Sequence, residues 1–175
     1  TMIVLAGASS FFVGDAFQAQ MPEYAQLFGA DETGVRYAVL LAASATGAIL
    51  GVLLLEGTNI LRPSVRTAIV CAGLWGVMMG LFPMAQSYPT AVVLLVLAGV
   101  FSITFTSMAQ TLVQILAPAG LRGTVVGLFN TAMLGLRAGS GLTVGLLGTL
   151  IGIRLSLELS SLMVVFTAIA LFGLD

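Results

Sequence analysis

Residues 124–150 read TVVGLFNTAMLGLRAGSGLTVGLLGTL, an apolar run that contains a single charged residue, Arg137. A helix needs about 20 apolar residues to cross a bilayer core, so this run predicts a membrane-spanning helix. Arg137 lies at its centre, roughly 20 Å from each end at 1.5 Å per residue. Its side chain cannot easily reach bulk water from there, so it needs a carboxylate, backbone carbonyls or a water-filled cavity. Arg137 is therefore the first candidate for a functional residue.

The composition of the whole chain agrees with a membrane setting. Of 175 residues, 59% are hydrophobic and only 7% are charged, and the mean hydropathy is +1.13. Soluble domains carry about 25% charged residues, so most of this chain is expected to be solvated by the lipid bilayer. The net charge of −1 argues against nucleic acid as a partner, because that role needs a basic face.

The residue types that usually carry catalysis are scarce. The chain has no histidine and one cysteine, Cys71, which lies within an apolar run. This excludes a disulfide framework and predicts neither a metal site nor a cofactor. The predicted spans offer one carboxylate, which is too few for an acid/base pair, so an enzyme is disfavoured.

A window of about 20 residues finds six predicted spans. The fold class predicted is an all-α membrane protein, a six-helix bundle in a single transmembrane domain over residues 1–175. The last span is short, and turn residues and most charges fall between the spans. The predicted spans are 2–20, 35–55, 67–85, 91–117, 124–150 and 159–174.

Arginine placement predicts the orientation. An even number of spans puts both termini on one side. The loops on that side hold Arg62, Arg66 and Arg122, whereas the opposite side has Arg36 and Arg154. The positive-inside rule then places both termini in the cytoplasm of a multi-pass protein of the cell (inner or plasma) membrane.

Polar side chains are distributed unevenly among the spans. The third and sixth spans contain no charged residue, which indicates that they face lipid, whereas the first, fourth and fifth would line a polar cavity. The candidates for a substrate or proton pathway are Asp15, Gln18, Gln110, Gln114, Asn130 and Arg137.

Each of these candidates has a structural alternative. Asp15, with Gln18 one turn on, is either a titratable carboxylate in a translocation path or a hydrated acid near the outer interface. Arg137 is expected to share a helix face with Asn130, seven residues earlier. It either contacts an anionic substrate group or a titrating carboxylate, or ties helices together permanently. Gln110 and Gln114 either form a cavity wall or make hydrogen bonds between helices.

Pairs of small residues at four-residue spacing predict close helix packing, because they let helix backbones approach without intervening side chains. The faces expected to pack in this way are Gly47–Gly51, Gly76–Gly80 and Gly141–Gly145.

Residues 118–141 resemble the C-terminal half of a major facilitator superfamily transporter, nearest the bacterial siderophore and macrolide efflux branch. That branch has a Pro-x-x-x-Arg-Gly turn leading into a glycine-rich helix, although Ala138 stands here where proline is common. The matching residues are Pro118, Arg122, Gly123, Gly135 and Gly139. Residues 22–55 are similar to the segment around the first cytoplasm-to-outside crossing of the same half, through Pro22, the Leu-Phe-Gly sequence at 27–29 and the helix with Gly47 and Gly51.

The resemblance implies a function. It implies a half-transporter of 3+3 helices that exports a small amphipathic compound, driven by a proton gradient, through alternating access. Such a half needs a second six-helix half, in the same polypeptide or another chain. The superfamily's charged loop has a counterpart in Glu56, Arg62 and Arg66, but the spacing departs from the pattern and the acid is a glutamate.

Two other readings stay open. The chain could be a non-transporting membrane subunit that assembles with a partner through its glycine-rich helix faces. It could also be a simple pore, which would need rings of charge or constrictions built by oligomerisation.

Overall fold

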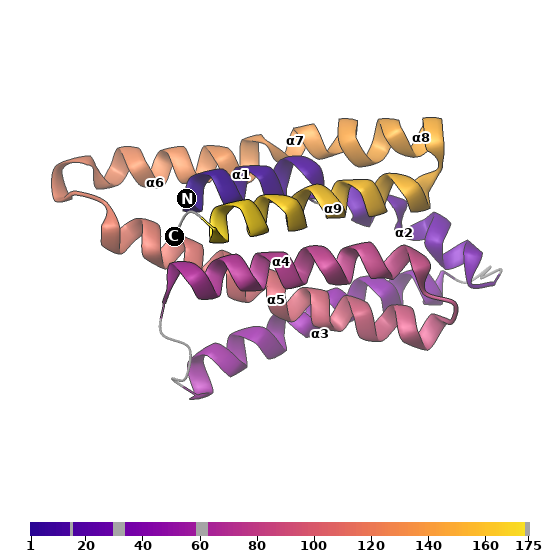
Figure 1. The fold of residues 1–175 in the computed structure, drawn as a ribbon. Coiled ribbons are helices and arrows are strands. Elements are labelled where there is room, and N and C mark those ends of the chain that lie inside the picture. Colours follow the sequence, from indigo (N-terminus) through magenta and orange to yellow (C-terminus); the bar gives the residue numbers. More distant parts are fainter. Residues whose placement is uncertain (15, 30–33, 59–62, 174–175) are drawn as a thin grey trace.

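The computed structural model describes residues 1–14, 16–29, 34–58 and 63–173, and every regular element in these ranges is helical (Figure 1). The all-α fold predicted from the sequence is confirmed for this part of the chain. In chain order the elements are α1 (Met2–Phe12), α2 (Ala16–Leu27), α3 (Val35–Thr58), α4 (Val65–Leu81), η1 (Phe82–Met84), α5 (Tyr88–Leu116), η2 (Ala119–Leu121), α6 (Arg122–Asn130), η3 (Thr131–Gly135), α7 (Arg137–Ser140), η4 (Gly141–Leu146), α8 (Leu147–Ile151) and α9 (Ile153–Phe172).

The helices are long and apolar enough to form a membrane bundle. Helices α1 and α2 meet at a bend of 43°, and together they run from one end of the bundle to the other (Figure 1). Counted as one broken span, they bring the number of crossings to six. The other five are Val35–Leu55, Val65–Met84, Tyr88–Leu116, Ala119–Ile151 and Ile153–Phe172.

The first span departs from the continuous helix predicted over residues 2–20. It breaks after α1, where Gly14 adopts a φ of +44°, a left-handed conformation that side chains other than glycine rarely take. The second part, α2, then continues to Leu27 with Pro22 inside it, so that Pro22 is not in a loop. The span is therefore bent near its middle.

The last two spans are joined more tightly than predicted. Arg154 and Glu158 favour a loop over residues 151–158 in the sequence. Instead, Gly152 alone makes the turn, with a φ of 91°, and α9 begins at Ile153. Arg154 and Glu158 both lie in the first two turns of α9. These charges therefore indicate the end of a membrane-spanning helix and not a loop.

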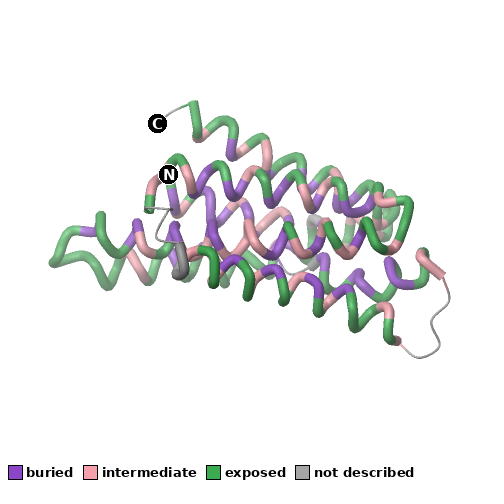
Figure 2. Tube along the Cα trace, turned by 90° about the horizontal axis from the view of Figure 1, so that it is seen from below, coloured by how far each residue is buried: buried purple, intermediate pink, exposed green. Residues whose placement is uncertain are grey.

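The prediction that the third span faces lipid holds for only one side of the helix, where Val70, Val77 and Leu81 are exposed. Helix α4 packs against both α5 and α9, and half of its most apolar window is buried, against 12% for Ala119–Ile151. An apolar helix can fill a protein interior as well as face lipid, and α4 does both. Helix α9 does expose one apolar face, with Leu159, Phe166 and Ile169 on it. Figure 2 shows exposed positions recurring along the bundle surface.

Helices α3 and α5 make the closest contact in the bundle, at glycines. A Cβ on Gly47 would collide with the backbone carbonyl of Val96, and one on Gly99 with the carbonyl of Ser44. One on Gly51 would meet the side chain of Ile103. The absence of side chains is what lets these backbones approach.

The other glycine pairs lie in different surroundings. On α4, Cβ atoms on Gly76 and Gly80 would lie 3.0 and 3.5 Å from side-chain atoms of α9. Gly141 and Gly145, by contrast, have nothing within 4 Å of such an atom. The first pair faces a neighbouring helix, and the second faces open space in the described part of the chain.

Both ends of the chain lie at the same end of the bundle. Helix α1 begins and α9 ends there, together with the connections from α3 to α4 and from α5 to α6 (Figure 1). The turn at Gly152 and the connection from α4 to α5 lie at the opposite end (Figure 1). This arrangement is the one required of six antiparallel crossings.

Candidate functional site

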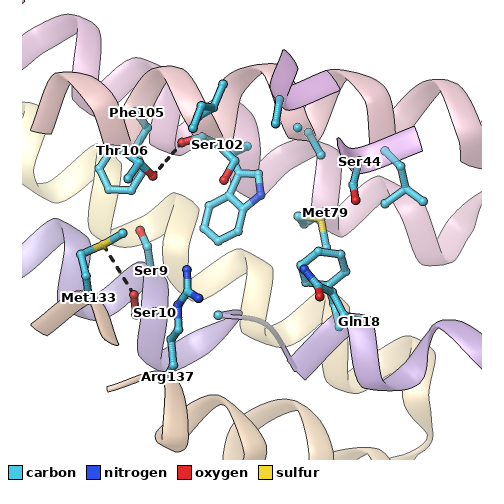
Figure 3. A pocket seen from close by; sticks show the side chains of 18 residues that line it. Ser9, Ser10, Gln18, Ser44, Met79, Ser102, Phe105, Thr106, Met133 and Arg137 are labelled. Atoms are coloured by element: carbon cyan, nitrogen blue, oxygen red, sulfur yellow. Dashed lines mark hydrogen bonds between the residues drawn. The ribbon is translucent and has the colours of Figure 1, made fainter. Parts of the chain in front are cut away.

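A cavity of about 310 Å³ lies among the first five crossings, near their midpoints. Ser102, the central residue of α5, is part of its wall, as are Ser44 of α3 and Trp75 of α4. The volume lies at the lower end of the range of small-molecule sites. The lining residues include both hydroxyl-bearing and large apolar side chains (Figure 3).

The hydroxyl groups of the cavity differ in their partners. Thr106 donates to the carbonyl of Ser102 at 2.9 Å, and Ser44 donates to Leu41 at 2.9 Å. Ser10 contacts the sulfur of Met133 at 3.7 Å. Ser9 Oγ has no hydrogen-bond partner among the described residues, although only 2% of the residue is exposed. An unsatisfied buried hydroxyl costs about 1–3 kcal/mol, so a partner arriving in the cavity would be favoured.

Arg137 contributes the guanidinium of the site. Figure 3 shows its side chain extending toward the space beside Ser9 and Ser10. Arg137 opens the short helix α7, which lies between the π-helical segments η3 and η4. Such wide turns inside a helix are frequent at functional sites. The geometry brings a positive charge to a hydroxyl-lined cavity at the centre of the membrane span.

The cavity also has an apolar side. Phe17 of α2, Trp75 and Met79 of α4 and Phe105 of α5 line it, and all four are at least nine-tenths buried. Aromatic side chains offer large flat surfaces with low conformational freedom. The site can therefore hold a molecule with both an apolar portion and hydrogen-bonding groups.

The structure brings two of the six predicted pathway residues into the cavity, Gln18 and Arg137. Asp15 lies outside the described residues, while its described neighbours Gly14 and Phe17 line the cavity. Three others, Asn130, Gln110 and Gln114, are exposed and do not line it.

The register of the helices explains these outcomes. Gln110 and Gln114 continue the face of Ser102 and Thr106 at four-residue spacing, but the cavity ends at Thr106. A regular helix would place Asn130 on the same face as Arg137. The π-helical turn of η3 lies between them, and one extra residue in a turn rotates the following helix by about 100°.

Several lining residues were not among the predicted ones. Ser102 precedes Thr106 by one turn, so extending the polar stripe of the fourth span would have found it. Serine is too common in membrane helices for its type alone to have pointed to Ser9, Ser10 and Ser44. Trp75 was missed because the sequence places the third span against lipid.

The charges predicted for the cytoplasmic loops can be placed only in part. Arg66 and Arg122 are exposed at the end of the bundle that holds both termini. Glu56 belongs to α3, but its side chain lies outside the description, as does all of Arg62. Among the described residues, no group of three or more His, Cys, Asp or Glu side chains could hold a metal ion.

A second polar cluster joins α2 to the last two crossings, on the side away from the termini. Gln20 donates to the carbonyl of Val144 at 2.9 Å, and Ser156 donates to the same oxygen at 2.8 Å. Tyr24 donates to the carbonyl of Ile153 at 3.0 Å. These bonds hold α2, the second part of the bent span, against η4 and α9.

Arg36 lies at the same end of the bundle as this cluster. Its guanidinium donates to the carbonyl of Phe28 and lies 5.8 Å from the centre of the Tyr88 ring. Tyr88 in turn donates to the Arg36 carbonyl at 3.0 Å. Arg36 therefore fastens the start of α3 to the start of α5.

Comparison with known proteins identifies the chain's family. No curated protein and no solved structure matches it. Residues 1–142, well over half of the chain, match the Major Facilitator Superfamily. The match covers α1 to α7 and ends in η4, so it includes the cavity and Arg137. With its apolar crossing helices, this chain belongs to the Major Facilitator Superfamily of membrane transporters.

Proposed function

We propose that the chain is one half of a secondary transporter that exports a small amphipathic compound in exchange for protons. The observation that carries the proposal is the cavity near the centre of the crossings. It combines hydroxyls and a guanidinium with aromatic surface. A molecule with an apolar body and hydrogen-bonding groups matches that combination.

The proposed mechanism is alternating access. The bend at Gly14 and the π-helical turns beside Arg137 interrupt two cavity-lining spans at mid-depth. Discontinuous helices near the bilayer midplane are a common way of building transporter sites. We infer that these breaks let the halves of each span tilt as the cavity opens to one side and then to the other.

A second six-helix half, covalent or separate, would complete the cavity. The Ala119–Ile151 stretch supports this proposal because little of it is buried within the described chain. Around Gly141 and Gly145 a further helix could approach closely, since a Cβ there would meet nothing within 4 Å. Both termini are proposed to be cytoplasmic, on the arginine bias of the connecting loops.

Transport itself can be measured with the full protein in sealed vesicles. A fluorescent amphipathic dye should leave the compartment that corresponds to the cytoplasm when a proton gradient is imposed, and a protonophore should stop it. A non-transporting subunit predicts no gradient-dependent dye movement. Saturable flux without single-channel currents would also exclude a pore.

Asp15 is the proposed proton-linked group. Asp15→Asn should lower proton-driven export at least about tenfold without affecting insertion. The asparagine amide does not bind and release protons as a carboxylate does, so it cannot couple export to the proton gradient. Initial export rates at several imposed pH gradients measure the effect.

The matched control is Glu23→Gln, which neutralises an exposed carboxylate on α2 away from the cavity. This variant should export normally. Equal export by Asp15→Asn and wild type would remove Asp15 from the mechanism.

A further inference from the structure

A groove separate from the central cavity runs between α4 and α9. Its volume is about 240 Å³, and it follows α9 from Glu158 to Val165, roughly 10 Å at 1.5 Å per residue. Apart from Glu158 and Ser161, every lining residue is glycine or apolar. The lining residues are Gly76, Val77, Gly80, Leu81, Met84, Glu158, Ser161, Leu162 and Val165.

The groove opens on the face of the bundle that lipid covers. Its rim is formed by exposed apolar side chains, among them Leu81, Met84 and Leu162, which are 43%, 63% and 60% exposed. These residues belong to segments that cross the membrane. Gly76 and Gly80 form part of the wall between the two helices, where a Cβ atom would lie 3.0 and 3.5 Å from α9 side chains, so a large side chain at either position would fill the groove.

One end of the groove is polar. Glu158 lies in the second turn of α9, about 8 Å from the start of the helix, a depth close to the boundary between headgroups and hydrocarbon. Its carboxylate makes no hydrogen bond or ion pair with the residues that the structure describes. A carboxylate at this depth favours a cation with hydrogen-bond donors.

The floor holds a second polar group without a partner. Ser161 is 1% exposed, and its hydroxyl makes no hydrogen bond within the described ranges. It lies one turn deeper than Glu158 and lines the same groove. An acceptor entering the groove is the partner that would satisfy it.

We propose that this groove binds one membrane phospholipid with a primary-amine headgroup, such as phosphatidylethanolamine. The ammonium group donates to Glu158, and an ester carbonyl, which follows the headgroup inward, accepts from Ser161. One acyl chain then lies along Gly80 and Gly76. A choline headgroup has a similar charge but no N–H to donate, and a glycerol headgroup brings no cation, so both bind less tightly.

Tryptophan fluorescence tests the proposal at the groove itself. In full-length protein carrying Trp75→Phe, Leu162→Trp places a reporter in the groove wall. Phe166→Trp places a control reporter one turn further along α9, outside the groove. Vesicles of phosphatidylcholine with increasing brominated phosphatidylethanolamine, and the reverse mixture, give the relative affinity of the two lipids at each reporter.

The reporter at position 162 should show about a tenfold preference for phosphatidylethanolamine over phosphatidylcholine, which corresponds to the free energy of one charge-assisted hydrogen bond. The reporter at position 166 should show no preference. Glu158→Gln should remove the preference at 162, whereas Glu23→Gln should keep it. Gly80→Leu, which fills the groove with Glu158 intact, should also remove it. The assignment would be overturned if the reporter at position 162 showed no preference for phosphatidylethanolamine in the protein with Glu158 and Gly80 intact. It would also be overturned if the preference survived Glu158→Gln or Gly80→Leu.

Discussion

Replacing Arg137 with methionine is expected to abolish export while leaving the protein folded and inserted in the membrane. Methionine preserves much of the length and apolar volume of the side chain but removes the charge and all five N–H donors. Charge-assisted hydrogen bonds contribute about 1.5–3 kcal/mol each, so losing those to a substrate or coupling group should slow export at least about a hundredfold. Folding is measured separately, by size-exclusion profile and thermal unfolding in detergent.

Two further arginine variants sharpen the Arg137 test. Arg137→Lys keeps the charge but loses the planar fork, and should retain a small part of the activity. Arg122→Met removes an exposed arginine at the end of the same span and should export normally. Unfolding or aggregation of the Arg137→Met protein would instead identify Arg137 as a structural tie between helices. Normal export by that variant would exclude Arg137 from both substrate binding and coupling.

Adding one methyl group at Gly99 is expected to destabilise the α3–α5 contact strongly. The new Cβ of Gly99→Ala would collide with the backbone carbonyl of Ser44, and would lie 2.9 Å from the backbone nitrogen of Ala48. Backbone atoms within a helix cannot move aside singly, so the two helices must separate. Overpacking typically costs about 1–3 kcal/mol, and a clash with backbone should reach or exceed the upper end.

Gly123→Ala, in the first turn of α6 at the end of the bundle, is the matched control for the α3–α5 contact. Nothing lies within 4 Å of the added methyl group, and alanine favours a helix over glycine by up to about 1 kcal/mol. Thermal unfolding in detergent should therefore place Gly99→Ala well below wild type and Gly123→Ala near or above it. Similar unfolding temperatures for the two variants would contradict the close approach of α3 and α5.

Much of the architecture could be predicted because the membrane imposes a simple rule. Apolar length identifies each crossing, and turn residues with charges mark most of the connections. The rule failed where charged residues lie inside a helix and not in a connection. Arg154 and Glu158 suggested a loop, but Gly152 makes the turn alone and both residues are helical.

Two residues of the site could be predicted, Arg137 from its depth in the span and Gln18 from its position one helical turn after Asp15. Arg137 could be predicted because a cation in the middle of a membrane span is costly unless it has a polar partner or water. Asn130 was misplaced because the regular helical period was assumed through η3, where the chain makes a π-helical turn. Trp75 was missed because apolar patterning cannot tell a helix buried in protein from one buried in lipid.

The central claim is that the cavity near Ser102 is wet and opens toward both sides of the membrane in turn. Ser102→Cys, in a Cys71→Ala background, tests it with a charged, membrane-impermeant thiol reagent added from either side. Ile169→Cys on the lipid-facing surface of α9 is the negative control, and Gly120→Cys in an exposed turn is the positive one. We predict that the thiol at position 102 reacts from both sides, whereas the thiol at position 169 does not react. A thiol at position 102 that stays unreactive from both sides, under conditions in which the Gly120→Cys protein is labelled, would contradict the claim.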